Sequence, residues 1–434
     1  MFKYQTQLLI TKMQVNIGLI GIGTIGAGVV KILGKNSKLI EQRTGVKLNL
    51  KKVCDVKLDN AKSLGLKPEQ LTKNADDIFK DKSISIVMEL IGGYEPAHTF
   101  IMKAIKAKKH VVTANKAVIA KYGKEIFEAA VKNKVNVKFE AAVGGCIPII
   151  RALQHSYVSQ NIKKIYGILN GTTNFILTRM EEGMSYEDAL RKAQQLGFAE
   201  ADPSFDVEGK DASQKLGILA MLSFNSWIDT EIRTEGITRL SKNDLIYADE
   251  LGYKIKLLGI AKKDDNEIEL RVHPTMIPKS HGLAAVKNEL NAVYISGEDT
   301  GEGMLYGKGA GQMPTATVVV GDVVDIARNL DCASKIDMSN KLKIKDSSLI
   351  KSKYYLKFTV LDKPGVLAKI ATILGNNNIS IAAVAQKEIE KDIVPVIIIT
   401  HTAIERDLIK AVKEINSLPI VKDETVLIRI EDLG

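Results

Sequence analysis

Short apolar runs alternate with segments of helical spacing through the first third of the chain. The runs VNIGLI, LNLKKVC, ISIVMELI, HVVTA and VNVKFEAA have the length and composition of buried strands. Helical patterns follow the first run and recur near residues 61–65, 96–107 and 121–133. This alternation is typical of a doubly wound α/β sheet, in which ligands bind beyond the carboxyl ends of the strands.

A glycine-rich turn follows the first apolar run. Gly21, Gly23 and Gly26 form a GxGxxG pattern, and TIGAGVVKILGK continues with helical spacing. The glycines allow a tight turn and close backbone approach, while the helix N-terminus offers N–H groups to a pyrophosphate. We therefore predict a Rossmann-type dinucleotide-binding domain over residues 1–147, completed by a glycine-rich loop and helix at about residues 305–330.

The remaining pattern predicts two further domains. Longer elements over residues 148–304 indicate an α+β substrate domain with a mixed sheet. Residues 331–352 are rich in Lys, Asp and Ser, as expected of a linker. Residues 353–434 follow the order βαββαβ, which is the ferredoxin-like arrangement and indicates a separate small domain.

An acid-rich stretch, GFAEADPSFDVEGKDASQK at residues 197–215, carries the clearest candidate chemistry. Asp211 and Lys215 are four residues apart in a helical pattern and therefore share one helix face. The carboxylate can hold the ammonium, which can in turn donate a proton to a carbonyl oxygen. Taken alone, the same pattern also fits a surface helix with one ordinary ion pair.

Composition narrows the class of protein. The chain has 434 residues, of which 45% are hydrophobic and 26% charged, so about three folded domains are expected. The net charge of +10 is dispersed, without a basic block interleaved with aromatic residues, so we expect no nucleic-acid partner. Neither a long apolar span nor a signal peptide is evident, so we expect no membrane partner.

The cysteines point to a reducing compartment. Cys54, Cys146 and Cys332 are far apart in the sequence and have no metal-binding spacing, which fits a cytoplasmic protein. Met13 directly precedes the first strand pattern, so either Met1 or Met13 is a plausible physiological start.

With these pieces placed, the chain resembles the homoserine dehydrogenase family over nearly its whole length. The motifs GLIGIGTIGAGV, VVTANKA, FEAAVGGCIPII, NGTTNFIL, GFAEADPSFDVEGKDASQKL and LYGKGAG carry the resemblance. The tail resembles an ACT domain, a regulatory amino-acid-binding module, through DKPGVLAKIA. The resemblance implies interconversion of L-aspartate 4-semialdehyde and L-homoserine with NAD or NADP, on the route to threonine, methionine and isoleucine.

The resemblance also implies roles for individual residues near the substrate. Lys215 is the expected proton donor, oriented by Asp211, and Lys116 is expected to contact both cofactor and substrate. Alternatively, Lys116 is a solvated lysine at a helix start. The expected substrate-binding residues are Glu200, Asp206, Lys116 and Thr172. Asp202 fits either a substrate contact or a turn.

Cofactor contacts are expected at the glycine turn and at the strand ends. Asp55 favours the ribose hydroxyls of NAD, whereas Lys57 offers charge to the 2′-phosphate of NADP, so the preference stays open. The expected cofactor-binding residues are Gly21, Gly23, Thr24, Ile25, Gly26, Asp55, Lys57, Gly92, Ala114, Lys116 and Gly309.

Two further sites rest on the resemblance. Backbone oxygens suit a hard cation, and a sodium ion is implied at Glu140, Val143, Gly145 and Ile147. In the tail, an amino-acid effector, with threonine as first candidate, is expected at Asp362, Gly365 and Val366; alternatively, this domain only pairs subunits. We expect a homodimer or a homotetramer.

Two other functions remain open on the sequence. The same fold serves dehydrogenases of other amino acids or hydroxy acids, which activity on lactate or glutamate would reveal. A non-catalytic sensor of a dinucleotide and an amino acid is the alternative from a different class. The joint presence of Lys116 and Lys215 argues against the sensor.

Overall fold

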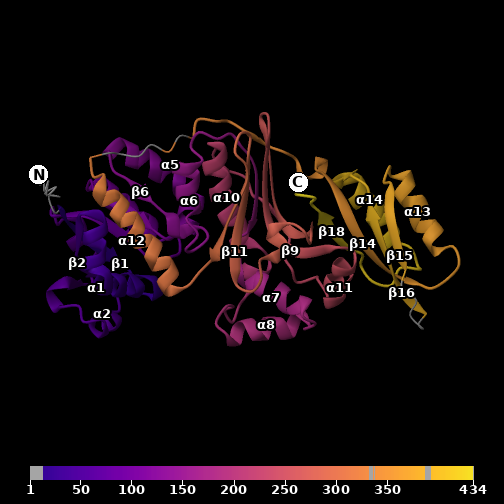
Figure 1. The fold of residues 1–434 in the computed structure, drawn as a ribbon, viewed down its shortest axis with the longest axis horizontal. Coiled ribbons are helices and arrows are strands. Elements are labelled where there is room, and N and C mark those ends of the chain that lie inside the picture. The colour runs from indigo at the N-terminus through magenta and orange to yellow at the C-terminus, as the bar shows by residue number, and fades with distance from the viewer. Residues whose placement is uncertain (1–12, 332–335, 337, 387–391, 434) are drawn as a thin grey trace, which may run out of the picture. The chain divides into compact units, whose positions relative to one another are not determined.

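The computed structural model describes residues 13–331, 336, 338–386 and 392–433 (Figure 1). The segment before Met13, Cys332 and residues 333–335 and 337 of the expected linker lie outside this range. The chain forms two compact units. One contains Met1–Val158, Met221–Trp227 and Gly307–Ser339, and the other contains Ser159–Ala220, Ile228–Tyr306 and Asn340–Gly434.

The first unit is built on a parallel sheet of six strands among the described residues, in the order β3-β2-β1-β4-β5-β6. The expectation of a Rossmann-type domain is thereby confirmed. The strands are β1 (Met13–Ile20), β2 (Val46–Cys54), β3 (Leu71–Thr72), β4 (Ile84–Glu89), β5 (His110–Thr113) and β6 (Val137–Lys138). The helices between them are α1 (Thr24–Thr44), α2 (Asp59–Ser63), α3 (Asp76–Phe79), α4 (Ala97–Lys106) and α5 (Lys116–Asn133).

The last of these strands is shorter than the apolar run VNVKFEAA predicts. Residues Glu140–Ala142 form a 3-10 turn instead of continuing the strand. The Glu140 carboxylate accepts the backbone N–H groups of Ile150 at 2.9 Å and Arg151 at 2.7 Å. These bonds tie the turn to the chain that follows it, so the apolar composition of the run reflects burial in a turn rather than a strand.

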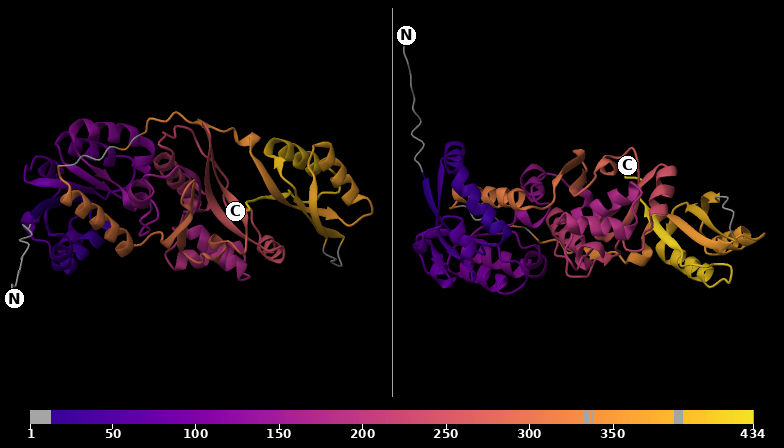
Figure 2. Two further views of the ribbon diagram at one scale, coloured as in Figure 1. Left: turned by 45° about the horizontal axis from the view of Figure 1, so that its top comes forward. Right: turned by 90° about the horizontal axis from the view of Figure 1, so that it is seen from below.

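Helix α12 (Gln312–Arg328) packs along α1 in the same unit, as both views of Figure 2 show. Gly28 makes this close approach possible, because a Cβ at that position would lie 2.9 Å from both the Ala316 Cβ and the Gln312 carbonyl oxygen. The Gln312 side-chain amide also donates to the Thr24 carbonyl at 3.0 Å. The returning helix thus closes one face of the parallel sheet.

The second unit contains a mixed sheet with the path β12-β11-β7-β9-β10-β18-β14-β16-β15 through the described residues. Its first part comprises β7 (Ile162–Ile168), β9 (Tyr253–Asp264), β10 (Glu267–Pro278), β11 (Leu290–Gly297) and β12 (Gly301–Lys308). The accompanying helices are α7 (Gly171–Glu181), α8 (Tyr186–Gln195), α9 (Ser204–Val207), α10 (Lys210–Phe224) and α11 (Lys242–Glu250). This mixed sheet with helices confirms the α+β expectation.

The C-terminal elements follow the βαββαβ order that the sequence predicts. They are β14 (Lys351–Leu361), α13 (Val366–Asn376), β15 (Ile381–Gln386), β16 (Ile393–Thr400), α14 (Glu405–Asn416) and β18 (Val426–Ile430). Their core includes Leu356, Phe358, Ile370 and Leu408. We expected a separate small domain, but β18 pairs in parallel with β10, joining Thr275 to Arg429, so the two sheets are continuous.

Among the described residues, every helix is too short or too polar to cross a membrane.

The contact between α1 and α12 gives a first testable prediction. Gly28→Ala should lower the free energy of unfolding by about 1–3 kcal/mol, because the added methyl group meets backbone and cannot be accommodated without a shift. Thermal unfolding would measure the loss.

Gly34→Ala is the matched control in the same helix. Gly34 is exposed, and a Cβ there would meet no atom within 4 Å. Alanine should therefore stabilise α1 by about 0.5–1 kcal/mol through its higher helix propensity. Equal effects at the two positions would contradict the close packing of α12 on α1.

Candidate functional site

A nearly buried lysine forms the centre of the candidate site in the second unit. The ammonium of Lys215, on α10, lies 2.8 Å from the Asp211 carboxylate and donates to the Leu169 carbonyl oxygen at 2.8 Å. The side chains of Lys215 and Asp211 are 12% and 6% exposed. The helical spacing that the sequence indicated therefore does bring the two groups together, and at low exposure the pair is more than a surface ion pair.

The amide of Asn170 connects two acids of this site. Its Nδ2 donates to Asp206 at 2.7 Å and to Asp211 at 2.8 Å, while its Oδ1 accepts the Thr173 N–H and caps α7. Burial raises the pKa of Asp206, and the charge of Asp211 raises it further. Sequence reasoning missed Asn170 as a site residue. The available signal was its position in NGTT directly after a strand.

The other expected substrate residues are placed differently. Thr172 is buried, and its hydroxyl donates to the Phe198 carbonyl at 2.5 Å. Glu200 is exposed, and its backbone carbonyl accepts the Gln194 amide. The Asp202 carboxylate accepts the Ser204 N–H at 3.0 Å at the start of α9, which supports the turn-forming interpretation.

The glycine turn in the first unit has the geometry of a phosphate-binding loop. Gly21 has a φ of 98°, and a Cβ at Gly26 would lie 2.1 Å from the Gly21 carbonyl oxygen. Gly23 precedes α1 without a capping side chain, and Gly23 and Thr24 are exposed. A cavity of about 280 Å³ opens beside them, lined also by Lys31 and Asn60. The first turn of α1 therefore borders this cavity, where an anion would meet the helix N-terminus.

Asp55 supports the glycine turn directly. One carboxylate oxygen accepts the Ile22 N–H at 2.7 Å, and the other accepts the Lys57 N–H at 2.9 Å. Each oxygen keeps a further lone pair for a ribose hydroxyl. The side chain of Lys57 is in an exposed position beside this acid.

Two strand ends in the same unit are joined by a second buried acid. Glu89, at the end of β4, accepts the Thr113 hydroxyl at 2.7 Å and the N–H groups of Ile91 and Gly92. Burial raises its pKa. Ala114 follows Thr113 at the end of β5. Sequence reasoning missed Glu89, which reads as part of an apolar strand.

Lys116 is the first residue of α5 and is half-buried. Asn115 caps this helix by accepting the Val118 N–H, and its amide donates to the Gly93 carbonyl at 2.7 Å. These bonds fix the loop that carries Lys116. Lys116 and Lys215 belong to different compact units.

The loop expected to hold a cation is tight. Gly144 and Gly145 have positive φ, and a Cβ at Gly145 would lie 2.5 Å from the Gly309 carbonyl oxygen. The Glu140 carbonyl accepts the Val143 N–H at 3.4 Å, and the Ile147 carbonyl accepts the Ile149 N–H at 2.8 Å. Since each carbonyl oxygen has two lone pairs, both can accept a second partner. The described residues contain no cluster of three or more His, Cys, Asp or Glu side chains suited to a metal.

The expected effector residues lie at the start of α13. Gly365 has a φ of 84° and is exposed, as is Asp362, whose carboxylate is 3.5 Å from the Gln386 amide. Val366 is buried in the core of the C-terminal domain, so only its backbone is available to a ligand.

Comparison with known proteins covers almost the whole chain. Residues 148–324 match the model of the family described as homoserine dehydrogenase, and residues 21–140 match the homoserine dehydrogenase NAD-binding domain. Residues 354–419 match the ACT domain.

Individual relatives agree with these matches. A homoserine dehydrogenase of Neisseria gonorrhoeae is 42% identical over 96% of this chain and 99% of its own length. The crystal structure of a homoserine dehydrogenase from Thiobacillus denitrificans is similar with a TM-score of 0.91 and 43% identity, covering 97% of this chain and 99% of its own. A hyperthermophilic archaeal homoserine dehydrogenase mutant in complex with NADPH has a TM-score of 0.62 and 28% identity, covering 72% and 97%.

The position of Asn170 between two acids gives a second prediction. Asn170→Asp should lower the free energy of unfolding by about 1–3 kcal/mol near pH 7, because the buried bridging donor becomes a third carboxylate beside the buried Asp211 and the half-buried Asp206. Raised carboxylate pKa values make the folded state bind more protons than the unfolded state above about pH 4. The free energy of unfolding that Asn170→Asp loses should therefore be small near pH 4 and increase as the pH rises. Denaturant unfolding across pH would measure it.

Asn161→Asp is the control for this prediction. Asn161 is exposed, and its amide donates to Glu298 at 2.8 Å, so the exchange also sets two carboxylates side by side. Solvent screens that pair, and a change within about 0.5 kcal/mol is expected. If both variants lose the same stability, Asn170 does not bridge Asp206 and Asp211 out of reach of solvent screening.

Proposed function

The chain belongs to the homoserine dehydrogenase family, and from this premise we propose how its residues interconvert L-aspartate 4-semialdehyde and L-homoserine. The contact that carries the proposal is the Lys215 ammonium held between Asp211 and the Leu169 carbonyl. In the direction of reduction, a nicotinamide cofactor held at the glycine turn of residues 21–26 would supply a hydride to the aldehyde carbon. Lys215 donates a proton to the aldehyde oxygen, which becomes the hydroxyl of homoserine.

Asp211 fits a positioning role in this reaction. Its carboxylate fixes the Lys215 ammonium and is itself fixed by the Asn170 amide. Two acceptors fill two of the three N–H directions of Lys215, which leaves one directed donor for the substrate oxygen. Such pre-organisation reduces the reorganisation needed when negative charge develops on that oxygen.

The substrate also carries an ammonium and a carboxylate. Asp206 and Glu200 supply negative charge for the ammonium, and the exposure of Glu200 leaves its side chain able to reach a ligand. Thr172 supports the site through its bond to the Phe198 carbonyl. We assign Lys116, which follows the β5 strand end, to contact with both cofactor and substrate.

We assign the nicotinamide cofactor to the glycine turn of residues 21–26, with Asp55, Gly92, Ala114 and Gly309 as further contacts. Both NAD and NADP fit this assignment. Asp55 suits ribose hydroxyls, and the exposed Lys57 suits a 2′-phosphate. The archaeal relative crystallised with NADPH supports the phosphorylated form.

A sodium ion is proposed at the backbone carbonyls of Glu140, Val143, Gly145 and Ile147. The free lone pairs on the Glu140 and Ile147 carbonyls fit a hard cation, as does the positive φ of Gly145. The ion would brace the loop between β6 and Pro148.

The ACT domain supports regulation by a small molecule. We propose that the effector is threonine, bound by the backbone near Gly365 and by Asp362, and that the enzyme acts in the cytoplasm in the biosynthesis of threonine, methionine and isoleucine. Helix α13 presents its first N–H groups there, which suit a carboxylate. The exposed side chains of the edge strand β15 suit subunit pairing, and we propose a homodimer or homotetramer.

The role of Lys215 predicts the outcome of its removal. Lys215→Ala should lower kcat for homoserine oxidation and semialdehyde reduction by at least about 10²-fold, because the proton must then come from water. Binding of NADPH, followed by fluorescence titration, should be unchanged.

Lys210→Ala provides the matched control on the same helix. Lys210 is 60% exposed and pairs with Glu208, so its removal takes away a lysine without touching Asp211. Its steady-state constants should stay within about twofold of those of the parent enzyme. Unchanged turnover in Lys215→Ala would remove that lysine from the mechanism.

Threonine regulation predicts a stereospecific effect on the intact enzyme. L-threonine at millimolar concentration should inhibit semialdehyde reduction by at least about 5-fold, the lower end of usual allosteric couplings. D-threonine, which has the same charges, should leave the rate unchanged. An enzyme indifferent to L-threonine would show that the domain senses another molecule or serves assembly.

A further inference from the structure

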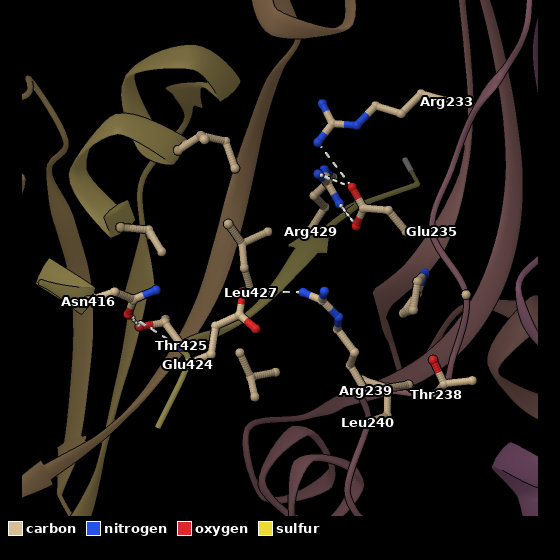
Figure 3. A pocket seen from close by; sticks show the side chains of 15 residues that line it. Arg233, Glu235, Thr238, Arg239, Leu240, Asn416, Glu424, Thr425, Leu427 and Arg429 are labelled. Atoms are coloured by element: carbon tan, nitrogen blue, oxygen red, sulfur yellow. Dashed lines mark hydrogen bonds and ion pairs between the residues drawn. The ribbon is translucent and has the colours of Figure 1, made fainter. Parts of the chain in front are cut away.

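A cluster of four charged side chains, two of them buried and two half-buried, joins the C-terminal domain to the rest of the second unit. Arg429, on β18, donates to the two carboxylate oxygens of Glu235 at 2.8 and 2.9 Å and also binds Glu405. Arg233 contacts Glu405 at 2.9 Å and Glu235 at 3.0 Å. Figure 3 shows Arg233, Glu235 and Arg429 converging at one side of a cavity.

The two arginines of the cluster balance the charge of its two glutamates, and hydrogen bonds fix the orientation of the side chains. Arg429 and Glu405 are 3% and 2% exposed, and the Tyr354 hydroxyl donates to Glu405 at 2.8 Å. Burial raises the pKa of Glu235 and Glu405, but hydrogen bonds and the charge of Arg429 outweigh this and lower both pKa values. A bidentate arginine–carboxylate pair constrains both distance and orientation. Glu235 is thereby held in one position relative to β18.

The residues after Glu235 pack against the helix that carries Asp206. A Cβ at Gly236 would lie 2.2 Å from the Val207 carbonyl oxygen, and the Ile237 N–H donates to that same oxygen at 2.9 Å. Val207 is the last residue of α9 and directly follows Asp206. Backbone therefore meets backbone, with no flexible side chain between them to absorb a displacement.

The residues before Glu235 touch the other end of the same turn. Thr234 belongs to the short strand β8 (Arg233–Thr234), and its Cγ2 would lie 2.9 Å from a Cβ at Gly209. Gly209 connects α9 to α10, which carries Asp211 and Lys215. The segment 233–237 thus packs against both ends of the turn from Val207 to Gly209. This turn connects Asp206 on α9 to Asp211 on α10.

We propose that Glu235 is a positioning residue for substrate binding, through which the docking of the C-terminal domain sets the place of Asp206. The proposal rests on the assignment of Asp206 to the substrate ammonium. Arg429 fixes the Glu235 carboxylate through two hydrogen bonds. The backbone of residues 236–237 packs against and hydrogen-bonds the Val207 carbonyl, and Val207 is the next residue after Asp206. A ligand that shifts β18 therefore changes the affinity for substrate. Because such coupling is reciprocal, bound substrate changes the affinity for that ligand by the same free energy.

The cavity beside the cluster leaves room for such a shift. Its volume is about 730 Å³, and it lies between the segment from Arg233 to Leu240 and the C-terminal residues of α14 and β18. Apolar side chains line part of it, among them Ile409. Figure 3 labels two others, Leu240 and Leu427. Packed interiors resist displacement, whereas an open face does not.

Glu235→Gln tests the proposal on the full-length enzyme. It keeps the shape of the side chain and removes the charge that orients it against Arg429. The KM for homoserine should rise at least about 5-fold, with kcat within about twofold, as expected when substrate binding alone is weakened. Binding of NADPH should be unchanged, because the glycine turn belongs to the other compact unit.

Glu424→Gln is the matched control. Glu424 and Arg239 also link the C-terminal domain to residues 238–240, at 3.3 Å, but they are 71% and 84% exposed and lie at the rim of the cavity. This variant should leave the KM for homoserine within about twofold of the parent value. An equal rise in both variants would overturn the specific role of Glu235, as would an unchanged KM in Glu235→Gln.

A second variant at position 235 and the activity of the parent enzyme complete the test. If Glu235→Gln does not fold, Glu235→Asp retains the charge on a shorter side chain, and a raised KM with unchanged NADPH binding is again expected. A normal KM in that soluble variant would overturn the proposal. Failure of the proposed function would show separately, as absence of homoserine oxidation in the parent enzyme.

Discussion

The second compact unit depends on a charge that is almost removed from water. The Lys215 side chain is 12% exposed, and the desolvation of its ammonium is offset by Asp211 and by the Leu169 carbonyl, each at 2.8 Å. Leu169 follows β7, and Asp211 lies in the first turn of α10. The folded position of this one ammonium therefore fixes the end of a strand against the start of a helix.

Asp211 needs a hydrogen-bond donor in addition to Lys215, because a second acid, Asp206, lies close to it. Asp206 and Asp211 share the Asn170 amide, and their mutual repulsion contributes to the raised pKa of Asp206. An amide can donate to both acids and still cap α7 with its oxygen. The geometry of the site thus follows from satisfying the hydrogen bonds of Asn170, Asp206 and Asp211 at once.

The sequence predicts the repeating parts of this molecule well. The glycine turn, the parallel strands, the βαββαβ order and the i,i+4 pair of Asp211 and Lys215 all leave local patterns, and the structure contains each of them. The roles assigned to individual site residues stay predictions. The structure reports only where these residues lie.

What the sequence could not supply are contacts between distant segments. Asn170 reaches Asp206 and Asp211 across 36 and 41 positions, and no periodicity signals an amide placed between acids. Glu89 is hidden in an apolar strand because its partners are backbone N–H groups of the turn that follows. The run VNVKFEAA ends early as a strand because Glu140 binds the backbone of a later helix, which local composition does not reveal.

The join between the two sheets also consists of contacts between segments that are distant in the sequence. Only Thr275 with Arg429 and Met276 with Ile430 pair between β10 and β18, so the ladder itself is short. Charged side chains flank it, including Arg271 with Glu431, which are both buried, and the buried Arg429 with the half-buried Glu235. Buried ion pairs add little net stability over apolar packing, yet losing one partner is costly. We interpret the join as one that defines the register between β10 and β18 and adds little stability. Such a join would transmit small changes in the docking of the C-terminal domain to the position of Asp206.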